Sequence, residues 1–197
     1  MSIKFVVFDF DGVFNDGIVC INNKGIVLKK YNSKDGMGIG LLKKNNIKVG
    51  VISGYKNNGS QKEILKHLKI DYIALETKNK LEKLQEWCEE LNIDMKTEVA
   101  YMGDDLNDMQ VINEVNLSGC PFDAVEEIKQ IVKFKSEKKG GEGCVREFCD
   151  FILNKLENKL GYFDEIKLDI NYINDEDFGS GFELLDSSYS TKVNNIK

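Results

Sequence analysis

The sequence is poor in the residues that build zinc sites and disulfide frameworks. It contains one histidine and five cysteines, and no two of the cysteines form a C-x-x-C pair. Scattered cysteines in an odd number argue against both kinds of site and suit a reducing compartment. We therefore expect a cytoplasmic protein without structural disulfides or zinc.

Long apolar runs, a signal sequence and an excess of positive charge are missing as well. No apolar stretch approaches the length of a membrane span, and the first residues lead directly into a predicted strand. Lys and Arg number 27 against 33 Asp and Glu, which gives a formal net charge of −6. These features predict no nucleic-acid or membrane partner. An anionic substrate would need a local positive site, from a metal ion or a few lysines.

The composition that is present fits one globular domain with an appendage. Of the 197 residues, 42% are hydrophobic and 30% are charged, which allows a sizeable core. From residue 159 the chain becomes acidic and rich in Asn, Ser and Gly. We expect one domain at 1–158 and a tail at 159–197 that is peripheral or partly disordered.

Short apolar runs alternate with amphipathic stretches, which is typical of an α/β fold with a doubly wound, mostly parallel sheet. Residues 17–31 are predicted to form a β-hairpin with its turn at 22–25. Asp35 is the expected N-cap of the first helix. The predicted strands are 3–10, 47–53, 70–75, 98–103, 115–119 and 131–135. The predicted helices are 35–46, 60–68, 79–91, 106–114, 125–129 and 143–156.

Polar residues follow four of the predicted strands, at the point where each strand ends. In an open parallel sheet, ligands bind outside the carboxyl ends of the strands. We therefore expect these side chains to meet at one edge of the sheet. They are Asp9 and Asp11 after the first strand, Ser53 and Gly54 after the second, Lys80 after the third, and Asp104, Asp105 and Asp108 after the fourth.

The residue types at this edge predict magnesium-dependent chemistry on a phosphate. Asp9 and Asp11 point to the same side of an extended chain, and together with Asp104 they repel one another unless a cation lies among them. Oxygen ligands without His or Cys favour Mg²⁺. One carboxylate can act as nucleophile and its neighbour as general acid/base. The hydroxyl, backbone N–H and lysine after the next strands can donate to phosphoryl oxygens.

Each of these motifs alone has an ordinary explanation, as a capped turn or a solvated surface group. Their order, with each motif at the carboxyl end of a strand, argues against coincidence. Several stretches in register also carry a resemblance: "FDFDGVFNDG", "SKDGMGIGLLKKNNIKVGVISG", "NKLEKLQEWCEELNI", "VAYMGDDLNDMQVINEVNLSG" and "GGEGCVREFCDFIL". The sequence at 4–156 resembles the haloacid dehalogenase superfamily of aspartyl-phosphate phosphatases. Within it, the sequence is similar to the phosphatases of 3-deoxy-octulosonate 8-phosphate (KDO-8-phosphate) and to their relatives that act on nine-carbon sialic-type acids.

The resemblance implies the Rossmann-like fold of this superfamily and a phosphatase domain at 1–158. It also implies that Asp9 is the nucleophile that forms an aspartyl-phosphate. Asp11 would protonate the leaving sugar oxygen and then activate the hydrolytic water. Ser53 and Lys80 would bind the phosphoryl group.

The resemblance further implies a magnesium site. Asp9, the backbone carbonyl of Asp11, and Asp104 would hold the ion, with Asp105 and Asp108 in a supporting shell. The substrate would be a 2-keto-3-deoxy sugar acid phosphate, either KDO-8-phosphate or a nine-carbon acid such as 2-keto-3-deoxynononate (KDN) 9-phosphate or N-acylneuraminate 9-phosphate.

Three residues depart from the pattern of the octulosonate enzymes. Asn15 stands where many relatives have Thr, Tyr55 follows Ser53-Gly54 where many have Arg, and Glu142 replaces the Arg of a "GGRG" motif. Tyr55 and Glu142 are therefore candidate substrate-binding residues. Because they replace cations, they leave the choice between an eight-carbon and a nine-carbon substrate open, and "GGEG" followed by "REF" is more similar to the nine-carbon group.

The sequence leaves no room for an inserted cap domain. The segments between Asp11 and Ser53 and between Lys80 and Asp104 are already filled by the predicted hairpin, helices and strands. Phosphoryl transfer benefits from the exclusion of water, so another subunit is the expected cover. The resemblance implies a homotetramer.

A different class of function is a non-catalytic oligomerisation or regulatory module with the same fold, of the kind that accompanies a sialic-acid cytidylyltransferase. Such a module should have lost part of the catalytic set, yet Asp9, Asp11, Lys80 and Asp104 are all present. A response-regulator receiver also clusters acids and a lysine on a parallel sheet, but it is shorter and does not need Asp11. The phosphatase remains the leading prediction.

Overall fold

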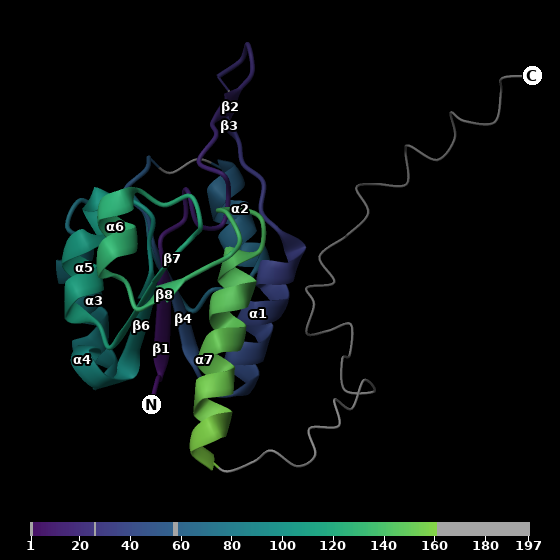
Figure 1. The fold of residues 1–197 in the computed structure, drawn as a ribbon. Coiled ribbons are helices and arrows are strands. Elements are labelled where there is room, and N and C mark those ends of the chain that lie inside the picture. Colours follow the sequence, from purple (N-terminus) through teal and green to yellow (C-terminus); the bar gives the residue numbers. More distant parts are fainter. Residues whose placement is uncertain (1, 26, 57–58, 161–197) are drawn as a thin grey trace, which may run out of the picture. The chain divides into compact units, whose positions relative to one another are not determined.

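A computed structural model describes residues 2–25, 27–56 and 59–160 (Figure 1). These residues form a six-stranded parallel sheet and a separate two-stranded antiparallel hairpin. The strands of the sheet follow the order β5-β4-β1-β6-β7-β8. They are β1 (Phe5–Phe8), β4 (Lys48–Ile52), β5 (Tyr72–Ala74), β6 (Val99–Met102), β7 (Leu117–Cys120) and β8 (Phe134–Lys135).

Helices cover both faces of the sheet (Figure 1). They are α1 (Ser33–Lys44), α2 (Gly59–His67), α3 (Lys80–Leu91), α4 (Met95–Glu98), α5 (Met109–Glu114), α6 (Glu126–Ile131) and α7 (Cys144–Leu160). The α/β class, the parallel sheet and the helices on both faces are confirmed. No described helix combines the length and the apolar character needed to cross a membrane.

The central strand β1 shows why this sheet is buried on both sides. All four of its residues are buried, and their side chains alternate between the two faces because the period of a strand is two. Val6 and Phe8 belong to the core that packs against α1, α2 and α7. Phe5 and Val7 belong to the core that packs against α3, α5 and α6. Polar residues after β1 are thus held at the centre of the sheet edge.

Helix α1 begins earlier than predicted, and its expected cap is wrong. The N-cap is Asn32, whose side chain accepts a hydrogen bond from the Lys34 backbone N–H at 3.0 Å. Asp35 instead lies inside the first turn and is fully buried. Its Oδ1 accepts a hydrogen bond of 2.9 Å from the backbone N–H of Arg146 in α7. Both Asn and Asp are good caps, and the sequence pattern does not say which of them the chain uses.

Other elements differ in extent from the prediction. The helix expected at 106–114 is divided into a 3₁₀ turn, η1 (Leu106–Asp108), and α5. The short helix α4 has no counterpart in the sequence prediction. Helix α7 runs past its predicted end and across the expected domain boundary at 158/159. The rest of the predicted tail, 161–197, lies outside the described residues.

The predicted hairpin is present with very short strands, β2 (Cys20–Ile21) and β3 (Val27–Leu28). Its turn is closed by a hydrogen bond of 3.0 Å from Gly25 N–H to the Asn22 carbonyl, and Gly25 has φ +74°. In Figure 1 the hairpin extends away from the sheet. The described residues between Asp11 and Ser53 form only this hairpin, α1 and β4, so no cap domain is inserted there.

Candidate active site

A cleft of about 350 Å³ lies at the carboxyl ends of the central strands. It collects most of the residues that the sequence singled out, although they come from distant parts of the chain. The lining residues are Asp9, Asp11, Gly12, Gly17, Ser53, Gly54, Tyr55, Asp104, Asp105 and Asn107. Lys80 and Asp108 lie directly behind this lining, in contact with Asp9 or Asp104.

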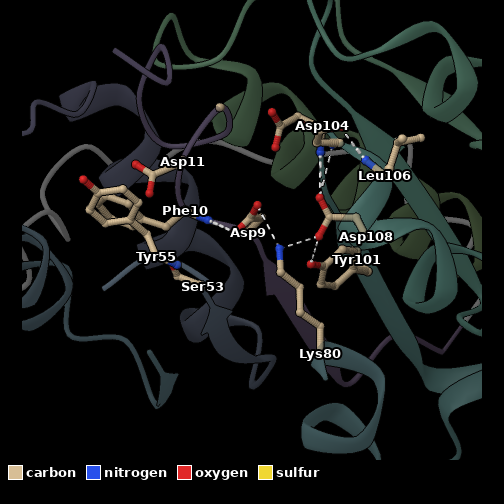
Figure 2. Close-up of polar contacts among 12 residues, drawn as sticks. Asp9, Phe10, Asp11, Ser53, Tyr55, Lys80, Tyr101, Asp104, Leu106 and Asp108 are labelled. Atoms are coloured by element: carbon tan, nitrogen blue, oxygen red, sulfur yellow. Dashed lines mark hydrogen bonds and ion pairs between the residues drawn. The ribbon is translucent and has the colours of Figure 1, made fainter. Parts of the chain in front are cut away.

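Lys80 is the buried cation at the floor of the site. Its Nζ lies 2.9 Å from Asp9 Oδ2 and 2.7 Å from Asp108 Oδ1, as Figure 2 shows. Burial lowers the pKa of Lys80, but the carboxylates of Asp9 and Asp108 outweigh it and hold that pKa above its usual value. The ammonium group therefore stays charged between the two carboxylates.

Asp108 has no free acceptor position for a further ligand. Its Oδ1 accepts from Lys80 Nζ and from the Tyr101 hydroxyl at 2.5 Å. Its Oδ2 accepts from the backbone N–H groups of Asp104 at 3.0 Å and Asp105 at 3.3 Å. A carboxylate offers about four lone-pair sites, so all are in use. Asp108 thus holds the lysine and the loop that carries Asp104.

Asp9 and Asp104 form an acidic pair at the centre of the cleft. One carboxylate oxygen from each of Asp9, Asp104 and Asp108 lies within 4.8 Å of the others. Burial, followed by repulsion from Asp108, raises the pKa of Asp9 to about 7. Burial, followed by repulsion from Asp9, raises the pKa of Asp104 to about 8. Lys80 alone does not balance three carboxylates, and the all-oxygen donor set fits Mg²⁺.

Gly12 lets Asp104 come close to the loop after β1. Gly12 has φ +78°, and a Cβ atom at this position would lie 2.0 Å from Asp104 Oδ2. Both the backbone conformation and the contact therefore require glycine. A Cβ on Gly140 would in turn lie 2.0 Å from the Gly12 carbonyl oxygen, so the "GGEG" loop packs closely behind the same turn.

The carboxylate of Asp11 is held apart from the acidic pair. Lys29 Nζ lies 2.5 Å from its Oδ1 and 2.6 Å from its Oδ2. Asn15 Nδ2 donates to Asp11 Oδ1 at 2.8 Å, and Asn15 Oδ1 accepts from Gly17 N–H at 2.8 Å. In Figure 2 Asp11 lies beside Tyr55, on the side of Asp9 away from Lys80. Asn15, a departure from the family pattern, thus braces Asp11.

The remaining predicted site residues occupy different places. Ser53 is buried at the end of β4, where its Oγ accepts from the Tyr55 backbone N–H at 3.3 Å. Tyr55 is 40% exposed in the cleft. Asp105 lines the cleft, but its Oδ1 caps η1 by accepting from Leu106 N–H. Glu142 is exposed and is not among the residues that line the cleft.

Three residues of this site are not indicated by the sequence pattern. For Tyr101 the sequence predicts only a position in an apolar strand. The contact of its hydroxyl with Asp108 depends on the loop that follows the strand. Asn107 lies inside the "GDDLND" motif, which is the one signal that could have found it. Lys29 has no such signal, because the path of the hairpin brings it to Asp11.

Comparisons with known proteins identify the family of this chain. A family model described as haloacid dehalogenase-like hydrolase matches residues 66–148. The 3-deoxy-D-manno-octulosonate 8-phosphate phosphatase of Salmonella typhi is 35% identical over an alignment of 163 residues that covers 81% of this chain and 86% of that protein. These matches span the elements that carry Lys80, Asp104 and Asp108.

Solved structures of relatives share the fold. The phosphatase of the same name from Yersinia pestis gives a TM-score of 0.76 at 33% identity and covers 81% of this chain and 85% of that chain. The Moraxella catarrhalis enzyme, solved with a magnesium ion, a phosphate ion and a KDO molecule, gives 0.74 at 29% identity and covers 82% and 94%. The chain therefore belongs to the KDO-8-phosphate phosphatase subfamily of the haloacid dehalogenase-like hydrolases.

Proposed function

We propose that this phosphatase hydrolyses a 2-keto-3-deoxy sugar acid phosphate through an aspartyl-phosphate intermediate on Asp9. The observation that carries the proposal is the buried group in which Lys80 bridges Asp9 and Asp108 beside Asp104. A carboxylate held next to a fixed cation and a second acid suits nucleophilic attack on a phosphoryl group.

In the first step, a carboxylate oxygen of Asp9 attacks phosphorus and the bond from phosphorus to the sugar oxygen breaks. Asp11 gives its proton to that oxygen, so the sugar acid leaves as an alcohol. In the second step, water attacks the phosphorus of the aspartyl-phosphate while Asp11 takes the proton. Inorganic phosphate leaves, and the Asp9 carboxylate is restored.

Lys80 and Ser53 assist by binding phosphoryl oxygens as negative charge redistributes. The residues fitted to hold Mg²⁺ are Asp9 and Asp104, with Asp108 as the residue that orients Asp104. When bound, Mg²⁺ would neutralise charge on the acids and on the phosphate. Asp11 is expected to contribute its backbone carbonyl, since its carboxylate is engaged by Lys29 and Asn15.

The substrate class is supported by the relatives, among them the Moraxella catarrhalis enzyme solved with KDO and phosphate. KDO-8-phosphate and nine-carbon acids such as KDN-9-phosphate or N-acylneuraminate 9-phosphate remain the two candidates. Tyr55 in the cleft is the residue expected to distinguish them. Glu142, exposed on the neighbouring loop, is a second candidate that would act only if the substrate extends to it.

Phosphate release from eight-carbon and nine-carbon sugar acid phosphates with Mg²⁺ tests the proposal. We expect one of these substrates to exceed a generic phosphate ester in kcat/KM. Asp9→Asn should abolish turnover, and Asp11→Asn should lower it by about 10²-fold or more. Wild-type rates in both variants would show that the mechanism is wrong. A generic ester that equals every sugar acid phosphate would show that the substrate class is wrong.

We further propose that the active form is a homo-oligomer, namely a tetramer. The hairpin supports this, because Ile18, Ile21 and Leu28 are 63%, 63% and 62% exposed, and an isolated two-stranded hairpin is marginal in water. Light scattering should give a mass above one chain, and Ile21→Asp with Leu28→Asp should dissociate it. A fully active monomer of the wild-type chain would contradict this proposal.

A further inference from the structure

Lys29 directly follows β3, and its side chain is buried although the residue as a whole is half-buried. Its side chain is 0% exposed, although Lys24 and Lys30 of the same hairpin are exposed. Its Nζ contacts both oxygens of Asp11. The ammonium group also lies over two aromatic rings, 4.1 Å from the centroid of Tyr55 and 5.4 Å from that of Phe10. Lys29 is thus enclosed by one carboxylate and two rings.

The backbone of Lys29 is fixed by helix α2 of the same chain. Ser60 Oγ accepts a hydrogen bond of 3.1 Å from the Lys29 N–H and donates one of 3.1 Å to the Val27 carbonyl. A single hydroxyl therefore holds the strand on both sides of Leu28, whose own side chain is exposed. This anchor directs the Lys29 side chain inward, independently of any second subunit.

The ion pair of Lys29 and Asp11 is not explained by stability alone. Burying a lysine side chain is costly, and an ion pair whose other member, Asp11, is 28% exposed contributes little net stability. Among the described residues, the hydrogen bonds given for the Asp11 carboxylate come from Lys29 and Asn15, and Asn15 reaches only Oδ1. Without Lys29, the carboxyl group would be free to rotate about that one remaining bond.

We propose that Lys29 is a positioning residue that fixes the Asp11 carboxyl group for proton transfer. This inference rests on the proposed function, in which Asp11 protonates the leaving oxygen and later accepts the proton of water. Lys29 orients this carboxyl group and takes no part in the proton transfer itself. A misplacement of about 1 Å of a reacting group can cost about 10²-fold in rate.

The test compares Lys29→Met with wild type on an alkyl and an aryl phosphate. With the better of KDO-8-phosphate and KDN-9-phosphate, kcat should fall by about 10²-fold, with a smaller change in KM. p-Nitrophenyl phosphate has a leaving group that needs little protonation, so its first step should remain fast while the second step is slow. The variant should therefore release a burst of about one nitrophenolate per active site before a slow steady state.

Ser60→Ala tests the same inference without removing the charge. It should lower kcat by a smaller factor, and the double variant should be no slower than Lys29→Met, because both changes act on Asp11. Lys62→Met, which removes an exposed lysine from α2, is the matched control and should retain wild-type kcat.

The outcomes separate the two proposals. Wild-type kcat in both Lys29→Met and Ser60→Ala, or equal losses on both substrates without a burst, would overturn the role of Lys29 and leave the proposed function standing. A wild-type protein that releases no phosphate from any of these esters with Mg²⁺ would overturn the proposed function and this inference together.

Discussion

The site has two halves that differ in how the fold supports them. The inner cluster consists of Asp9, Lys80, Tyr101, Asp104 and Asp108, most of it buried at the ends of the central strands and the first turn of α3. The outer group consists of Asp11, Lys29 and Tyr55, which lie on loops and on the hairpin. The inner cluster is therefore held by the central strands and α3, while the outer group is held by loops and the hairpin.

Among the lysine substitutions, removal of the inner cation should give the largest effect. Lys80→Met leaves Asp9 and Asp108 without their shared cation, so kcat should fall by about 10²- to 10³-fold. The free energy of unfolding without metal should fall by about 3 kcal/mol, since a broken buried pair leaves an uncompensated charge. Phosphate-release kinetics and urea unfolding measure the two effects.

Lys83→Met is the matched control on the same helix, because Lys83 pairs with Glu86 at the surface. Its unfolding free energy should stay within about 0.5 kcal/mol of wild type. If Lys80→Met behaved like Lys83→Met, the inner cluster would have no special role.

Mg²⁺ should stabilise the protein more at about pH 8 than at about pH 6. The pKa of Asp9 is raised to about 7 and that of Asp104 to about 8, above the usual 3.8. The folded state therefore holds these protons more tightly, and the metal-free protein loses stability as pH rises from about 4 to about 8. Bound Mg²⁺ would offset the repulsion between the carboxylates of Asp9 and Asp104. At a hundredfold excess over its Kd, Mg²⁺ should raise the free energy of unfolding by about 2.7 kcal/mol.

Thermal unfolding with and without Mg²⁺ at the two pH values checks this prediction. Asp104→Asn is the control and should lose most of the Mg²⁺ effect. Equal stabilisation at both pH values, or full stabilisation in Asp104→Asn, would contradict the assignment of the inner cluster as the metal site.

Asp35 is a buried acid outside the site and should respond to pH but not to Mg²⁺. Burial raises its pKa to about 7, and its Oδ2 has no hydrogen-bond partner among the described residues. Ionisation of Asp35 therefore lowers the free energy of unfolding by a growing amount as pH rises from about 4 to about 7. The change in the free energy of unfolding caused by Asp35→Asn should be more stabilising at about pH 8 than at about pH 5, by roughly 2 kcal/mol. Urea unfolding at both pH values measures this change. An equal effect of Asp35→Asn at the two pH values would contradict the prediction.

Within the outer group, Tyr55 should give the smallest effect. Tyr55→Ala removes the partly exposed ring over Lys29 and should raise KM for the preferred sugar acid phosphate by about 3- to 10-fold, since a cation–π contact of this kind contributes about 1 kcal/mol. Tyr55→Phe keeps the ring and should change KM little. Equal effects of the two substitutions would show that the hydroxyl, and not the ring, is what matters.

The inner cluster could be located from the sequence because its signals are local. Asp9 and Asp104 each follow a short buried strand, and Lys80 opens the helix after β5. Parallel strands bring their carboxyl ends to one edge. The alternation of apolar strands with amphipathic helices likewise predicted the sheet. Even in this cluster the contact of Tyr101 could not be predicted, because the sequence of an apolar strand does not show which hydroxyl contacts a carboxylate.

The outer group could be located only in part. Lys29 stands next to Lys30 in the sequence, and nothing in the local pattern says that the side chain of Lys29 is buried and that of Lys30 exposed. That difference depends on two hydrogen bonds of the Ser60 hydroxyl, which accepts from Lys29 N–H and donates to the Val27 carbonyl, a contact between distant segments. The cap of α1 shows the same limit, since Asn32 and Asp35 are both suitable residues and tertiary packing selects between them.

The most direct test of the central claim is to trap the phosphoryl group on Asp9. The Asp11→Asn variant, mixed with p-nitrophenyl phosphate and Mg²⁺ and quenched in acid, should accumulate about one phosphoryl group per active site. Peptide mass spectrometry should place that group on Asp9, and Asp9→Asn should remove it. A turnover-competent protein that carries no phosphoryl group, or carries it on another residue, would contradict the account.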